Sequence, residues 1–140
     1  MIRKSSRDIT HIVVHCTATK EGYSFSARDI DRWHRDIGWA EIGYNYVIKL
    51  DGTIEEGRDV DKVPSHVKGH NAKSIGIVYV GGLDENMKPK DTRTPAQKSS
   101  LIVLIARLRI LYPKAIILGH RDFPGVKKEC PCFDVKKEFK

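Results

Sequence analysis

The segment formed by residues 9–16 restricts the fold of this chain more than any other segment. It is rich in β-branched residues and ends in His15 and Cys16, which is typical of a strand. Its apolar side chains occupy successive positions, so we expect burial on both faces, as in the interior of a mixed or parallel sheet. The same alternation directs His15 and Cys16 to opposite faces, so only one of them can serve a site on a given face.

Four further strands are predicted from apolar runs that are bounded by turn residues. The pair Asp51-Gly52 separates two of these strands and indicates a tight hairpin. The pair Gly81-Gly82 closes a third strand. We expect the four strands at residues 42–49, 53–57, 74–80 and 115–118.

Two longer helices are predicted from the residues at their ends. Ser26 and Asp29 form an approximate capping box at the start of the first helix, and Gly38 is placed to end it. The run Thr94-Pro95-Ala96-Gln97 starts the second helix with a cap, a proline at the first position and a glutamine that completes the box. Pro113 stops this helix.

Strands interleaved with helices predict an α/β fold with a mixed five-stranded β-sheet flanked by α-helices. We also expect a short terminal helix at residues 133–140. A chain of 140 residues is long enough for one hydrophobic core but not comfortably for two, so residues 1–140 are predicted to form a single domain. Residues 1–8 are polar and are expected to form a flexible arm.

Charge and cysteine content restrict the partners of the chain. The net charge is +7 and the pI is about 9.4, which favours nucleic acid, an anionic cell-wall polymer or a membrane surface without choosing among them. No specific nucleic-acid motif is present. No transmembrane segment or signal peptide is expected, because no window has the required apolar core. The three cysteines are too few, and odd in number, for a disulfide scaffold.

The segment after the last predicted strand carries candidate metal ligands. His120 and Cys130 lie ten residues apart, and Lys128 stands two residues before the cysteine. Histidine and cysteine suit zinc, but this segment needs another ligand from elsewhere in the chain. The best candidate is His15, at the end of the first predicted strand. This combination predicts a zinc hydrolase.

Each candidate also has an ordinary explanation when it is considered alone. Taken alone, His15 at the end of an apolar strand fits an ordinary buried, hydrogen-bonded histidine. His120 fits an ordinary turn residue, and Cys130 fits a buried small hydrophobe. Tyr44 fits a strand core because aromatic residues favour strands. Lys128 follows Lys127 and would ordinarily be a solvated charge. Only the combination of motifs favours a site.

A series of short motifs runs through the chain in one order: His15-Cys16-Thr17-Ala18-Thr19, Gly43-Tyr44-Asn45-Tyr46-Val47-Ile48, Asp51-Gly52-Thr53, Glu56-Gly57-Arg58-Asp59, Ser65-His66, Asn71, Ser74-Ile75-Gly76-Ile77, Val80-Gly81-Gly82, Thr94-Pro95-Ala96-Gln97, Gly119-His120 and Cys130-Pro131-Cys132-Phe133-Asp134. In this order they resemble the zinc-dependent N-acetylmuramoyl-L-alanine amidases of the small phage-lysozyme type. Those enzymes are related to the animal peptidoglycan recognition proteins. The resemblance extends from about residue 10 to the C-terminus.

The resemblance implies the fold of these amidases and a zinc ion held by His15, His120 and Cys130. Three protein ligands leave a fourth position for water, which is the pattern of a catalytic site. It also implies that Tyr44 and Lys128 lie beside the metal as catalytic groups. Tyr44 would orient the attacking water or assist its proton transfer, and Lys128 would stabilise the oxyanion of the tetrahedral intermediate. Which of the two moves protons stays open.

The implied activity is hydrolysis of the amide between N-acetylmuramic acid and L-alanine in bacterial peptidoglycan. We expect a monomeric phage or prophage endolysin, made in the cytoplasm without a signal peptide. It would reach the cell wall after release, with a partner such as a holin. Two alternatives are a non-catalytic module that binds peptidoglycan and an additional role as an RNA polymerase-binding regulator. Cys130, Tyr44 and Lys128 argue against the first alternative.

The other cysteines and histidines are expected to have lesser roles. Cys16 should face away from the site, whereas Cys132 is an alternative ligand because it lies close to Cys130. His66 and His70 are expected to line or rim the cleft. His11 and His34 are expected to be structural or surface residues.

Overall fold

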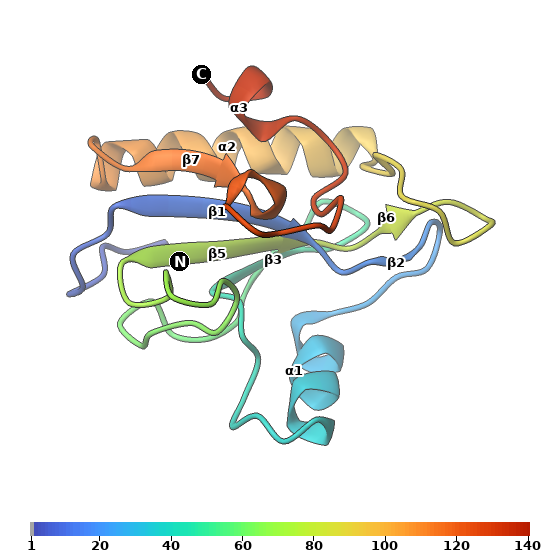
Figure 1. Ribbon diagram of the computed structural model, residues 1–140, viewed down its shortest axis with the longest axis horizontal. Helices are drawn as coiled ribbons and strands as arrows, with labels where there is room; N and C mark the ends of the chain where they lie inside the picture. The colour runs from blue at the N-terminus through green and yellow to red at the C-terminus, as the bar shows by residue number, and fades with distance from the viewer. Residues whose placement is uncertain (1) are drawn as a thin grey trace.

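A mixed five-stranded sheet forms the centre of the molecule in the computed structural model, which describes residues 2–140. The sheet has the order β4-β3-β5-β1-β7 (Figure 1). Its strand β1 runs parallel to both β5 and β7, while β4 pairs antiparallel with β3 at one edge. The strands are β1 (His11–Cys16), β3 (Tyr46–Ile48), β4 (Ile54–Glu56), β5 (Ser74–Tyr79) and β7 (Ile116–Gly119).

A second, two-stranded sheet lies beside the main one and was not predicted. It pairs β2 (Thr19–Lys20) with β6 (Gly82–Leu83), and strands of two residues are too short to show a periodicity. The helices are α1 (Ala27–Asp36), α2 (Pro95–Leu111), α3 (Val135–Glu138) and the 3₁₀ turn η1 (His120–Asp122). Within residues 2–140, none of the helices has the length and apolarity needed to cross a membrane.

The predicted helix starts are confirmed by their hydrogen bonds. The Asp29 backbone N–H donates to Ser26 Oγ at 3.2 Å, and the Ser26 backbone N–H donates to the Asp29 carboxylate at 2.8 Å. Thr94 and Gln97 form the second capping box, with Pro95 at the first helical position. These bonds satisfy backbone groups that have no partner inside the helix, and they join residues three apart, so the sequence predicts them well.

The strand predicted at residues 42–49 is shorter than expected, because only Tyr46–Ile48 pairs as β3. A Cβ on Gly43 would clash with the Ser65 carbonyl oxygen, so this part of the chain lies tightly against the loop after β4. The Asn45 side chain accepts a hydrogen bond from the Gly76 backbone N–H at 3.0 Å. A side-chain amide thus takes the place of one regular bond between strands.

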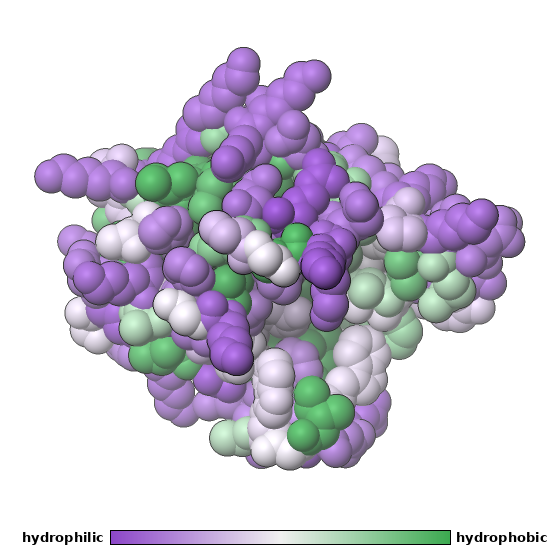
Figure 2. Space-filling model, viewed as in Figure 1, coloured by the Kyte–Doolittle hydropathy of each residue, from purple (hydrophilic) through white to green (hydrophobic). Residues whose placement is uncertain are grey.

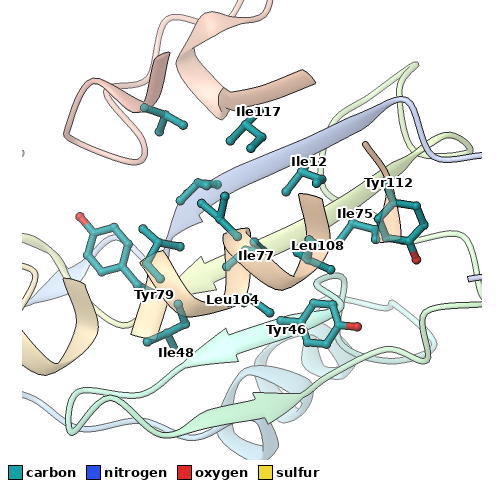
Figure 3. Packing of buried hydrophobic residues seen from close by; sticks show 14 of the residues in the cluster. Ile12, Tyr46, Ile48, Ile75, Ile77, Tyr79, Leu104, Leu108, Tyr112 and Ile117 are labelled. Carbon is teal, nitrogen blue, oxygen red and sulfur yellow. The ribbon is translucent and has the colours of Figure 1, made fainter. Parts of the chain in front are cut away.

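One face of the sheet carries the main hydrophobic core (Figure 3). Alternate residues of β1 and β5 point toward α2, which runs along this face (Figure 1). Close packing of side chains that are removed from water supplies most of the stabilisation of such a core. The fully buried members from the sheet and α2 are Ile12, Val14, Tyr46, Ile48, Ile75, Ile77, Tyr79, Leu101, Leu104, Ile105 and Leu108.

The opposite face is covered by shorter elements. Val13 packs with Val67 of the loop before β5 and with Phe123 after η1. A separate cluster joins this face to α1 through Ile30. His15 shares this face with Val13, whereas Cys16 joins the core beneath α2, so the predicted division between His15 and Cys16 is confirmed.

The residues before β1 are fastened to the domain although they form no helix or strand in the part described. Ser5 is buried, and its hydroxyl donates to the Val60 carbonyl oxygen at 2.7 Å. Its backbone N–H donates to Tyr112 Oη at 2.6 Å. Arg7 donates to the carbonyl oxygens of Val60 and Ser74 at 3.0 and 2.9 Å. The flexibility of this arm stays a prediction, but several of its residues have defined contacts.

Arg93 fastens the C-terminal segment to the start of α2. Its buried guanidinium lies 3.4 Å from the centre of the Phe133 ring and donates to the Glu138 carboxylate at 2.7 and 2.8 Å. It also donates to Asp91 at 2.9 and 3.0 Å. Burial opposes the charge, but the two carboxylates raise the pKa of Arg93 overall. The contact anchors the chain shortly after Cys130. Hydrophilic residues cover much of the face seen in Figure 2.

We predict that Arg93→Ala lowers the free energy of unfolding by about 2 kcal/mol, because it removes the buried member of a charge cluster whose carboxylates water can still reach. Arg3→Ala is the matched control. Arg3 also pairs with two carboxylates, those of Asp59 and Asp61, but its side chain is 49% exposed, so almost no change is expected. Urea unfolding of both variants measures the two free energies of unfolding. Equal losses of stability in Arg93→Ala and Arg3→Ala would contradict the stabilising role given to the buried Arg93.

Candidate metal centre

The parallel pairing of β1 with β7 brings His15 and His120 together. Val14 lies opposite Gly119 in the register, and each of these residues is followed by a histidine: His15 in β1 and His120 at the start of η1. The carboxyl ends of parallel strands lie at the same edge of a sheet, which is a frequent place for ligand sites. The two ring centroids are 4.6 Å apart. His15 is 1% exposed, and His120 is partly exposed.

Cys130 reaches the same place from the loop that follows η1. The Arg121 backbone N–H donates to the Cys130 carbonyl oxygen at 2.9 Å, and Tyr79 Oη donates to the Pro131 carbonyl oxygen at 2.6 Å. A Cβ on Gly119 would meet Pro131 Cδ at 2.8 Å, so glycine lets the loop close against the end of β7. Figure 1 shows this segment crossing in front of the sheet near the end of β1.

The three predicted ligands form one cluster. The ligand atoms of His15, His120 and Cys130 all lie within 4.8 Å of one another, and Cys130 Sγ is 4.0 Å from His15 Nδ1. Across residues 2–140 this is the one group of three or more such side chains with a spacing suited to a metal ion. Two imidazoles and one thiolate form a donor set that suits zinc.

The surroundings of Cys130 favour the thiolate, which is the form that binds metals. Hydrogen bonds from the Cys16 thiol and backbone lower the pKa of Cys130, although burial opposes them. The Cys16 backbone N–H lies 3.1 Å from Cys130 Sγ. Cys16 therefore supports Cys130 through both its thiol and its backbone N–H, although its side chain packs in the core.

Cys132 stays outside the cluster. Its sulfur lies 4.0 Å from Cys16 Sγ and 3.3 Å from the Gly82 carbonyl oxygen. Burial raises the pKa of Cys132 to about 12, so its thiol keeps its proton at neutral pH. The alternative of Cys132 as a ligand therefore receives no support from the geometry.

His66 lies closer to the site than its expected place on the rim. Its Nδ1 is 2.7 Å from His15 Nε2, and its Nε2 is 2.7 Å from Ser74 Oγ. Burial lowers the pKa of His66 to about 3, and burial also lowers the pKa of His15 well below its usual range, so both rings are neutral. His70 does not join them, because its ring packs against Phe123 with a centroid distance of 4.7 Å.

Tyr44 and Lys128 both lie near the cluster. The Tyr44 ring centroid is 5.0 Å from that of His15, and burial raises the pKa of Tyr44, so the phenol stays protonated and can donate a hydrogen bond. Lys128 is exposed and lines a cavity of about 330 Å³ together with Cys130. Burial lowers the pKa of His120, and the positive charge of Lys128 lowers it further.

Three candidate ligands with a protonated tyrosine and a lysine nearby have the parts of a metal-dependent hydrolase. The chain belongs to the N-acetylmuramoyl-L-alanine amidase family, whose model matches residues 5–133. It is therefore an amide hydrolase of that family.

Known proteins of the same family are similar over most of their length. The endolysin of Enterobacteria phage K11 is 43% identical over 131 residues, which cover 94% of this chain and 85% of that protein. The endolysin of Escherichia phage T7 is 44% identical, with 90% and 82% covered. The fold is similar to that of the amidase LysC from Clostridium intestinale, with a TM-score of 0.77 and 32% identity over 94% of this chain and 82% of that one.

We predict that Cys130→Ala abolishes metal binding while Cys16→Ala largely preserves it. Cys130 offers a thiolate to the cluster, whereas Cys16 is not a member of it, and alanine at position 16 removes the thiol hydrogen bond to Cys130 but retains the backbone N–H. Elemental analysis of both purified variants, together with competition against a chelator, measures the metal content and affinity. The ligand assignment fails if Cys16→Ala loses the metal and Cys130→Ala keeps it.

Proposed function

We propose that this chain binds one zinc ion through His15, His120 and Cys130 and hydrolyses the amide between the lactyl group of N-acetylmuramic acid and L-alanine in peptidoglycan. The observation that carries the proposal is the convergence of these three ligand atoms within 4.8 Å in a chain of the amidase family. Zinc bound there supplies a Lewis acid for the amide carbonyl and lowers the pKa of water to about 7.

The chain's own residues would orient the reactants and balance the developing charge. Tyr44 keeps its proton, so its hydroxyl can donate a hydrogen bond to the substrate or orient the attacking water. The positive charge of Lys128 acts on His120, where it lowers the pKa of the ring, and Lys128 would stabilise the oxyanion of the tetrahedral intermediate. The buried His15 and its neutral neighbour His66 add no positive charge of their own beside the reacting carbonyl.

The proposed substrate is supported by the relatives and by charge. The similar phage proteins are endolysins, and a mutant of the Drosophila protein PGRP-LB binds tracheal cytotoxin in a structure with a TM-score of 0.76 and 26% identity over 99% of this chain and 83% of that one. The net charge of +7 suits an anionic cell-wall polymer. We therefore propose that the chain acts on the bacterial wall as an endolysin. Binding to RNA polymerase and a monomeric state stay predictions.

We predict one zinc ion per chain, and lytic activity on purified peptidoglycan that a chelator removes and added zinc restores. The diagnostic product is a new amino terminus at L-alanine, which end-group analysis identifies. A non-catalytic peptidoglycan-binding module would bind the polymer without creating that terminus. Full activity in a preparation free of metal would end the zinc proposal.

We predict that Tyr44→Phe and Lys128→Ala lower kcat and kcat/KM together, by roughly 10²–10³-fold, because each removes a contact made in the transition state. Zinc content should stay at the parent level, since neither residue is a ligand. Tyr23→Phe and Lys127→Ala are the matched controls: Tyr23 is 55% exposed, and Lys127 lines the same cavity as Lys128. Near-parent kcat in Tyr44→Phe or Lys128→Ala would remove that residue from the mechanism.

A further inference from the structure

We infer that His66 and Ser74 act as positioning residues that set the tautomer of His15, so that its Nδ1 presents a lone pair to the metal. The inference deepens the proposed function and rests on it, because His15 acts as a ligand only there. It concerns a chain of three side chains behind the ligand cluster: His15, His66 and Ser74.

The contacts of His15 decide which of its two ring nitrogens faces the cluster. His15 Nε2 lies 2.7 Å from His66 Nδ1, so this nitrogen is already engaged in a hydrogen bond. The other nitrogen, Nδ1, lies 4.0 Å from Cys130 Sγ and therefore faces the cluster. A neutral imidazole carries its proton on one nitrogen and can bind a metal only through the other. His15 can serve as a ligand only if its proton resides on Nε2.

The contacts of Ser74 decide the direction of the hydrogen bonds along the three side chains. The Ser74 hydroxyl has two partners, His66 Nε2 at 2.7 Å and the Asn71 carbonyl oxygen at 3.4 Å. A carbonyl oxygen only accepts, so a hydroxyl that donates to Asn71 must accept from His66 Nε2–H. His66 Nδ1 then accepts, and His15 Nε2–H is the donor.

The reverse arrangement of protons would prevent His15 from binding the metal through Nδ1. If the Ser74 hydroxyl donated to His66 Nε2, His66 Nδ1–H would donate to His15 Nε2. The proton of His15 would then lie on Nδ1, between the ring and Cys130. The backbone carbonyl oxygen of Asn71 would also lose its hydroxyl partner, and would keep the Ser74 backbone N–H at 3.3 Å and Arg7 Nη1 at 3.4 Å. The first arrangement therefore keeps that hydrogen bond and leaves the lone pair on the nitrogen that faces the cluster.

The surroundings hold the His66 ring in place for this role. Its backbone N–H donates to Asn71 Oδ1 at 3.0 Å, as does that of Val67 at 2.9 Å, so the loop is closed at both residues. A Cβ on Gly76 would meet His66 Nδ1 at 2.9 Å, so the glycine in β5 lets the ring lie against the strand. Ser74 is fully buried. Such outer partners of a metal ligand fix its orientation and tautomer.

The test uses three variants and one control. His66→Phe keeps a planar ring but removes the acceptor. His66→Asn restores an acceptor near the position of Nδ1, and Ser74→Ala removes the group that orients His66. His70→Phe is the control, because His70 lies in the same loop and its ring contacts are with His11 and Phe123.

Two readouts separate this role from simple space filling. Nitrogen NMR of the metal-free parent should find His15 protonated on Nε2, and in His66→Phe and Ser74→Ala this tautomer should be lost or mixed. Zinc affinity, measured by competition with a chelator, should fall about 10–100-fold in His66→Phe and recover largely in His66→Asn. His70→Phe should match the parent in both measurements.

The outcomes are distinct. A metal-free parent with the proton on Nδ1 overturns the inference, as does a His66→Phe variant with the parent's zinc affinity. If His66→Phe fails to fold, Ser74→Ala decides the question, since it removes only a hydroxyl group. A parent that has the expected tautomer but binds no zinc would refute the proposed function and leave the proton arrangement intact.

Discussion

The parallel register between β1 and β7 is the constraint on which the rest of the site depends. With Val14 opposite Gly119, two histidines far apart in sequence become neighbours at one edge of the sheet. Parallel strands need long connections, and here α2 supplies the connection before β7 while covering one face of the sheet. The same chain path that buries the core therefore delivers His120 to His15. A shift of one residue would move His120 away and reverse the faces of β7.

The two faces of the sheet differ in their packing and in the side chains that they carry. The face beneath α2 is closely packed with aliphatic side chains and carries most of the burial. The other face is covered by loops, by η1 and by the small contact with α1, and it accommodates polar side chains such as His15 and Asn45. Cys16 joins both faces, since its side chain packs in the core and its backbone N–H donates to Cys130. Core packing thereby helps to hold Cys130 Sγ in position beside His15.

Much of the fold could be predicted because its signals are local. The capping boxes at Ser26 and Thr94 and the Asp51-Gly52 turn depend on residues close together in sequence, and the structure has them as expected. The late start of β3 could not be predicted, since it depends on Asn45 bonding to Gly76, which is distant in sequence. The Arg93 cluster was missed for the same reason, because its partner Glu138 lies 45 residues away.

The sequence by itself determined the alternation of strands and helices, the opposite faces of His15 and Cys16, and the family to which the motifs point. These follow from periodicity and from short motifs, which are properties of neighbouring residues. Only the tertiary structure decided that His120 and Cys130 meet His15, that Cys132 stays outside, and that His66 and Ser74 stand behind the cluster. Distances between residues far apart in the chain depend on strand order, register and loop closure, and no local pattern encodes those distances.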